Sequence, residues 1–158
     1  MRPARRRPML RRPESTWGTT MGRTLLGILL GAIVMWLTIF GLEFLGHALF
    51  PPPAGLDPQN PEHLARIIAE APLGAMAMLV LAWTAGAFTG AWTAARIARH
   101  PRTAALLIAL VVMSGVIGMI LMVPEHPKWI SALGLLLPIP VALIAAKVAQ
   151  WREKDLPK

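Results

Sequence analysis

Cysteine is absent from this 158-residue chain, and charged residues make up only 15% of it. Without cysteine the protein can form no disulfide, no thiolate metal site and no thiol nucleophile. With so few charges and 55% apolar residues, the chain is too apolar for a soluble domain of this length. Standard catalytic motifs are also missing, because the sequence contains no Walker loop, GxSxG, HExxH or GxGxxG. These absences favour a membrane protein without a standard catalytic signature.

Four apolar segments are each long enough to cross a membrane as a helix, which takes about 20 residues. The predicted spans are Thr24–Phe50, Leu73–Ala95, Thr103–Val123 and Trp129–Ala149. Their apolar runs are continuous rather than alternating, which excludes membrane-spanning strands. The sequence therefore predicts an all-α, integral membrane four-helix bundle over residues 23–150, with a basic tail at 1–22 and a short tail at 151–158. The first span is too long for the apolar region of a signal peptide, so we expect it to be retained.

The loop between the first two spans is predicted to hold one short amphipathic helix. Pro51 to Pro53 end the first span, because proline lacks an N–H donor and clashes with the preceding turn. Asn60 suits the N-cap position, and Pro61 suits the first helical position. Apolar residues then recur at one-face spacing, so we expect about ten helical residues that lie on the outer leaflet or cap the bundle.

The formal charge of +8 could suggest a nucleic-acid site, but the positions of the Lys and Arg residues indicate a membrane topology instead. Fourteen of the sixteen Lys and Arg residues fall on one side of the four-span arrangement, and Arg66 and Lys128 fall on the other. The positive-inside rule then predicts a multi-pass protein with both termini in the cytoplasm. The tail at 1–22 has no apolar periodicity, so we expect it to be disordered or to lie along anionic headgroups of the bilayer.

Small residues recur at every fourth position of the second span, a pattern that lets another helix approach closely. They are Ala82, Gly86, Gly90, Ala94 and Ala98. Gly27 and Gly31 in the first span are possible partners. The second span is therefore predicted to be central, and packing within one chain is favoured over packing in a homo-oligomer.

In the fourth span Pro138 and Pro140 predict a kink, interpreted as static rather than as a hinge.

Glu43 is the candidate ionisable group, because it lies near the outer boundary of the first span. His47 follows four residues later, on the same helix face. One interpretation is a hydrogen-bonded carboxyl that ties the span to His47, Trp83 or an outer-loop amide. Another is a proton or cation relay, in which Glu43 exchanges protons with His47.

A divalent metal site is a further hypothesis. The sequence Pro-Glu-His occurs twice on the predicted outer side and supplies His63 and His126. Imidazole and carboxylate ligands suit zinc and similar ions, so Glu43, His47, His63 and His126 form the candidate ligand set. A copper(I) variant would add the methionines in the outer halves of spans two and three, Met76, Met78, Met119 and Met122.

Two stretches, GLEFLGHALFPPPAGLDPQNPE and AWTAGAFTGAWTAARIA, resemble small uncharacterised four-span proteins of bacterial inner membranes. The resemblance covers the first two spans and the loop between them. It implies four helices in an inner membrane and no established activity. The leading hypothesis is a non-enzymatic accessory or structural protein whose outer face meets a partner protein or lipid. The alternatives are a proton-coupled or cation-translocating unit and a metal-dependent membrane enzyme.

Overall fold

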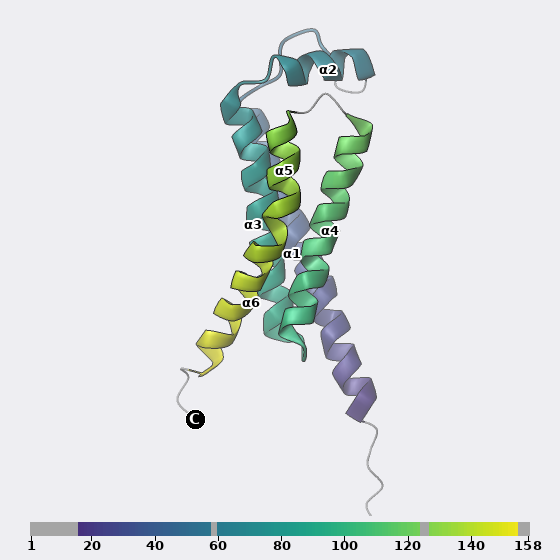
Figure 1. The fold of residues 1–158 in the computed structure, drawn as a ribbon, viewed down its shortest axis with the longest axis vertical. Helices are drawn as coiled ribbons and strands as arrows, with labels where there is room; N and C mark the ends of the chain where they lie inside the picture. The colour runs from purple at the N-terminus through teal and green to yellow at the C-terminus, as the bar shows by residue number, and fades with distance from the viewer. Residues whose placement is uncertain (1–15, 58–59, 124–126, 155–158) are drawn as a thin grey trace, which may run out of the picture.

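The computed structural model describes residues 16–57, 60–123 and 127–154 (Figure 1). Within these ranges the chain forms α-helices and no strand, which confirms the predicted all-α class. The helices of the described ranges are α1 Thr16–Leu49, α2 Pro61–Ala69, α3 Leu73–Ile97, α4 Pro101–Met122, α5 Lys128–Leu136 and α6 Pro138–Lys154.

Four helical stretches are long and apolar enough to cross a membrane. They are Met21–Leu49, Leu73–Ile97, Pro101–Met122 and Lys128–Trp151, the last being α5 and α6 together. The protein is therefore a multi-pass membrane protein, as the sequence predicts. One boundary differs, because α1 begins at Thr16, so the disorder expected of the tail is wrong for residues 16–22. No proline interrupts the chain between Thr16 and Phe50, so the helix extends back beyond its apolar run.

The spans form a bundle, and α2 lies across one end of it (Figure 1). The start of α1, the connection from α3 to α4 and the end of α6 all lie at the opposite end, which we call the termini end. Helix α3 contacts α1, α4, α5 and α6, so it is the central helix that the sequence predicts. Its small side chains fill the centre, since Ala82, Ala87, Ala91 and Ala94 are completely buried.

The contact between α1 and α3 is made by glycines that leave no room for a side chain. A Cβ atom built on Gly31 would lie 2.6 Å from the Gly90 carbonyl oxygen. A Cβ on Gly27 would lie 2.9 Å from the Ala94 carbonyl oxygen. The hydroxyl groups of Thr38 and Thr89 also hydrogen-bond across this interface at 2.9 Å. The glycine stripes therefore bring these helices together within one chain, and Met35 and Ile39 of α1 pack against the glycines of α3.

Many large apolar residues of α1 point away from the bundle, whereas Met35 is buried in its core. Exposed side chains include Leu29, Trp36, Leu37, Phe40 and Phe44, with exposures between 56% and 78%. In a bilayer this surface contacts lipid tails, where apolar exposure costs nothing.

The fourth span is interrupted at Leu137, between α5 and α6. Pro138 and Pro140 lack the N–H groups that would bond the carbonyls of Gly134 and Leu136. The helical pattern resumes directly, since the Val141 amide donates to the Leu137 carbonyl at 3.1 Å. Pro138 is buried and Pro140 is exposed, so the break is packed into the bundle on one side.

Candidate functional site: a pocket at the α2 end

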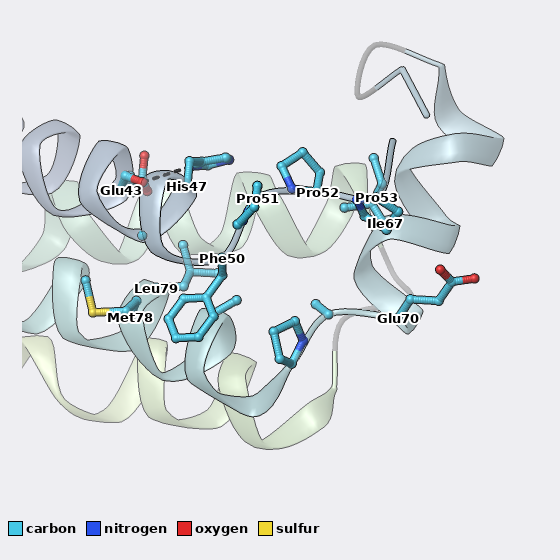
Figure 2. A pocket seen from close by; sticks show the side chains of 14 residues that line it. Glu43, His47, Phe50, Pro51, Pro52, Pro53, Ile67, Glu70, Met78 and Leu79 are labelled. Atoms are coloured by element: carbon cyan, nitrogen blue, oxygen red, sulfur yellow. Dashed lines mark hydrogen bonds between the residues drawn. The ribbon is translucent and has the colours of Figure 1, made fainter. Parts of the chain in front are cut away.

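A pocket of about 280 Å³ lies between the end of α1, the proline segment at 51–53, α2 and the start of α3 (Figure 2). We call it the α2-end pocket. Its apolar lining includes Phe50, Ile67, Met78 and Leu79 together with the prolines, and its charged or titratable members are Glu43, His47 and Glu70. An apolar cavity with a few polar groups is typical of a binding site.

The wall of the pocket is built by close docking of Phe50 on α3. The Phe50 amide donates to the Gly46 carbonyl at 2.8 Å, so the helical hydrogen bonding continues to the first proline. A Cβ atom at Gly74 would clash with the Phe50 ring, with its Cε1 atom at 2.8 Å. The aromatic ring can occupy this position only because the second residue of α3 is a glycine. This contact fixes where the prolines leave the bundle.

Glu43 and His47 lie one helical turn apart on the pocket side of α1. The His47 Nδ1 atom donates to the backbone carbonyl of Glu43 at 2.8 Å, because a carbonyl oxygen can only accept. This bond holds the imidazole over the last turn of α1 and leaves its Nε2 atom for another partner (Figure 2). The two residues are therefore adjacent, as their spacing predicts.

The Glu43 carboxylate is half-buried and makes no hydrogen bond or ion pair with any described residue. The predicted tie from this carboxylate to His47, Trp83 or a loop amide is therefore wrong for the part of the chain that the structure describes. His47 bonds the backbone of Glu43 instead. Trp83 is buried in the core, where its ring packs against Gly134. A relay between Glu43 and His47 stays a prediction.

Glu70 lies at the other end of the pocket from Glu43 (Figure 2). Its Oε1 atom accepts a hydrogen bond from Nε of Arg66 at 2.8 Å. This hydrogen bond, and with it the negative charge of Glu70, raises the pKa of Arg66 above its ordinary value. Glu70 is thus already in an ion pair, whereas Glu43 has no ion pair within 4.0 Å among the described residues. The two carboxylates do not form the close pair that acid–base catalysis between carboxylates requires.

Helix α2 is held by its own caps and by the loop before it. The Asn60 side chain accepts from the Glu62 amide at 3.0 Å, which confirms the predicted N-cap. The loop turns at Gly55, whose φ of 86° favours glycine. The Asp57 amide then donates to Nδ1 of His63 at 3.1 Å. His63 therefore fastens the loop to α2 through its Nδ1 atom.

The predicted metal site is not assembled by its described members. Among the described residues no three His, Asp or Glu side chains are grouped so that they could hold a metal ion. Glu43 and His47 line the α2-end pocket, whereas His63 bonds the Asp57 amide. His126 lies outside the described residues. Of the methionines in the copper variant, Met78 lines the pocket and Met122 is 85% exposed.

The sequence indicated Glu43 and His47 but missed the remaining lining of the pocket. Pro51 to Pro53 were expected to end a helix, and they also form the rim. Phe50 docks on Gly74, a contact between residues far apart in sequence that no local pattern indicates. The spacing of Arg66 and Glu70, four residues apart on one helix, is a signal that could have identified their ion pair.

Comparison with known proteins leaves the site to be interpreted from its own geometry. The chain matches no protein-family model, no curated protein and no solved structure. The resemblance to small four-span inner-membrane proteins stays a prediction.

Proposed function

We propose that this chain is a non-enzymatic accessory protein of a bacterial inner membrane, and that its α2-end pocket binds a partner membrane protein. The partner segment places an apolar side chain in the pocket and a cationic side chain against Glu43. One observation carries the proposal: the pocket is largely apolar, and Glu43 is its carboxylate without an ion pair among the described residues. Glu70 is already paired with Arg66, so it does not compete for the cation.

The depth of Glu43 supports binding at the membrane surface. The 19 residues from Thr24 to Leu42 rise roughly 28 Å as a helix, which brings Glu43 to the edge of the hydrocarbon. A cation from a neighbouring protein can reach this position from the water side. Pairing a half-buried carboxylate with a cation also offsets part of the desolvation cost of the carboxylate.

The proposed orientation places the termini end in the cytoplasm and the α2 end outside. Its support is the excess of Lys and Arg at the termini end, where the start of α1, the α3–α4 connection and the end of α6 lie together (Figure 1). Cytoplasmic loops and tails carry such an excess in inner-membrane proteins. The assignment to a bacterial inner membrane rests on the resemblance of the first two spans.

A photo-crosslinking amino acid at position 52 tests the proposal in the full-length protein in its native membrane. Pro52 is exposed on the pocket rim, and the matched control position is Leu121, which is 78% exposed near the same end but outside the pocket. We expect one protein adduct from position 52. Glu43→Gln should lower its yield about fivefold, corresponding to about 1 kcal/mol for a partly exposed ion pair.

The control substitution is Glu62→Gln, which removes an exposed carboxylate outside the pocket lining. It should leave the yield unchanged. An adduct obtained equally from position 121, or one that Glu43→Gln does not weaken, contradicts the proposal. Adducts with lipid alone at position 52 contradict it as well, and would assign the pocket to a lipid.

A further inference from the structure

A second pocket, of about 480 Å³, lies between α4 and α6 at the termini end, and we call it the Lys147 pocket. Its lining consists of Arg102, Leu143, Lys147, Gln150 and Trp151. Both charged members are cations, and neither is within 4.0 Å of a carboxylate among the side chains that the structure describes. Two cations that share a pocket repel each other, so the site favours an anion between them.

The aromatic member of the pocket holds one cation in place. The Lys147 Nζ atom lies 5.0 Å from the centre of the Trp151 ring, a cation–π contact. Tryptophan prefers the depth of lipid headgroups, where its apolar ring and its N–H group are both accommodated. The Gln150 side chain adds an amide donor. The pocket therefore places donors and positive charge at headgroup depth.

Apolar side chains lead from each cation toward the middle of the membrane. On α6, Ile139 and Leu143 precede Lys147 at intervals of four residues and are 37% and 40% exposed. On α4, Leu106 and Leu110 follow Arg102 at the same interval and are 36% and 53% exposed. Residues four apart share a helix face, so each cation stands at the head of an apolar stripe.

We propose that the Lys147 pocket binds the phosphate group of an anionic membrane lipid, with the acyl chains lying along the two apolar stripes. Arg102 and Lys147 contact the phosphate from the two helices. The exposed leucines and isoleucine contact the chains, an arrangement that a free phosphate ion cannot use. The lipid thereby links α4 to α6 beside the break at Leu137.

Lipid titration of the purified full-length protein in mild detergent, followed by native mass spectrometry, tests this site. The probes are phosphatidylglycerol, phosphatidylcholine and inorganic phosphate. We expect phosphatidylglycerol to bind more tightly than phosphatidylcholine. Arg102→Gln and Lys147→Gln should each weaken its binding about fivefold, and the double variant about 25-fold.

The matched control is Arg96→Gln. Arg96 lies near the same end of the bundle and stacks on Trp92 at 4.8 Å, as Lys147 does on Trp151, but it does not line the pocket. This variant should change the affinity for phosphatidylglycerol by less than about twofold. The charge-conserving variants Arg102→Lys and Lys147→Arg should also stay within about twofold of the wild-type affinity. Circular dichroism and gel filtration verify that each variant is folded.

Three results would overturn the proposal. The first is an equal loss in Arg96→Gln, which would show that the cations act as a diffuse surface charge. The second is equal binding of phosphatidylcholine. The third is displacement of the lipid by inorganic phosphate at matching concentration, which would assign the pocket to free phosphate. Glu43→Gln should leave lipid binding unchanged, so the outcome is independent of the function proposed for the α2-end pocket.

Discussion

Replacing Gly31 by alanine adds one methyl group at the closest approach of α1 and α3. Its Cβ atom would lie 2.6 Å from the Gly90 carbonyl oxygen and 2.8 Å from Cβ of Ala94, whereas ordinary contact begins at 3.4 Å. The nearest atom belongs to the backbone, so no side-chain rotation relieves the contact. The two helices must therefore separate by about 0.8 Å, the difference between 3.4 and 2.6 Å.

The expected loss follows from two opposing contributions. Overpacking of this kind costs about 1–3 kcal/mol. Alanine returns up to about 1 kcal/mol, because it favours a helix over glycine. With the full return of about 1 kcal/mol, we therefore expect Gly31→Ala to lower the free energy of unfolding by up to about 2 kcal/mol. Reversible unfolding in mixed micelles, followed by far-ultraviolet circular dichroism, measures this quantity.

Gly115→Ala is the matched control, because a Cβ atom at Gly115 has nothing within 4 Å. It makes the same chemical change in another spanning helix, so only the helix preference acts. We expect it to raise the free energy of unfolding by up to about 1 kcal/mol. If Gly31→Ala proved as stabilising as Gly115→Ala, the close contact between α1 and α3 would be refuted.

A double-variant cycle sharpens the same test. A Cβ at Gly90 would lie 2.8 Å from the Gly31 carbonyl oxygen and 2.6 Å from Cβ of Met35, both on α1. One separation of α1 from α3 relieves the contacts that both substitutions make across this interface, although a Cβ at Gly90 would also lie 3.1 Å from Cγ2 of Ile108 on α4. The double variant Gly31→Ala/Gly90→Ala should therefore lose less stability than the sum of the two single variants.

Two further predictions concern hydrogen bonds that the structure shows. The Thr38–Thr89 bond crosses between α1 and α3, so a Thr38→Val/Thr89→Val cycle in the same unfolding assay should give a coupling energy of about 0.6 kcal/mol; a coupling of zero would contradict this bond. Asn60→Ala should destabilise α2 by about 1 kcal/mol and speed hydrogen exchange of the Glu62 amide. Global unfolding should change little, because no Cα atom of α2 lies within 8 Å of a Cα atom in another described helix, although Ile67 lines the α2-end pocket; a lowered unfolding midpoint would show instead that α2 supports the spans.

Local patterns were sufficient for the elements of this fold. Continuous apolar runs of more than about 20 residues leave only membrane-spanning helices, because every backbone group must be bonded within the hydrocarbon. Asn60 and Pro61 located the start of α2 to the residue, since capping depends on neighbours in sequence. The start of α1 was predicted less well, because helix formation continues through polar residues where no proline stops it.

The candidate sites depended on contacts that no local pattern encodes. Glu43 and His47 were identifiable because they share one helix face. That the Glu43 carboxylate has no ion pair with the part of the chain that the structure describes depends on side-chain placement. The metal hypothesis needed His63 to group with them, and among the described residues no three such side chains are grouped so that they could hold a metal ion.

The sequence by itself determined four spanning helices, the central role of the second span and the cap of α2. Each follows from periodicity, length or capping within a single segment. Only the tertiary structure decided that Phe50 docks on Gly74 to form the α2-end pocket, and that Arg102 and Lys147 share another. The physical reason is that a pocket is the space left between helices, and its shape depends on how closely their backbones approach. Gly31 and Gly90 set that approach between α1 and α3.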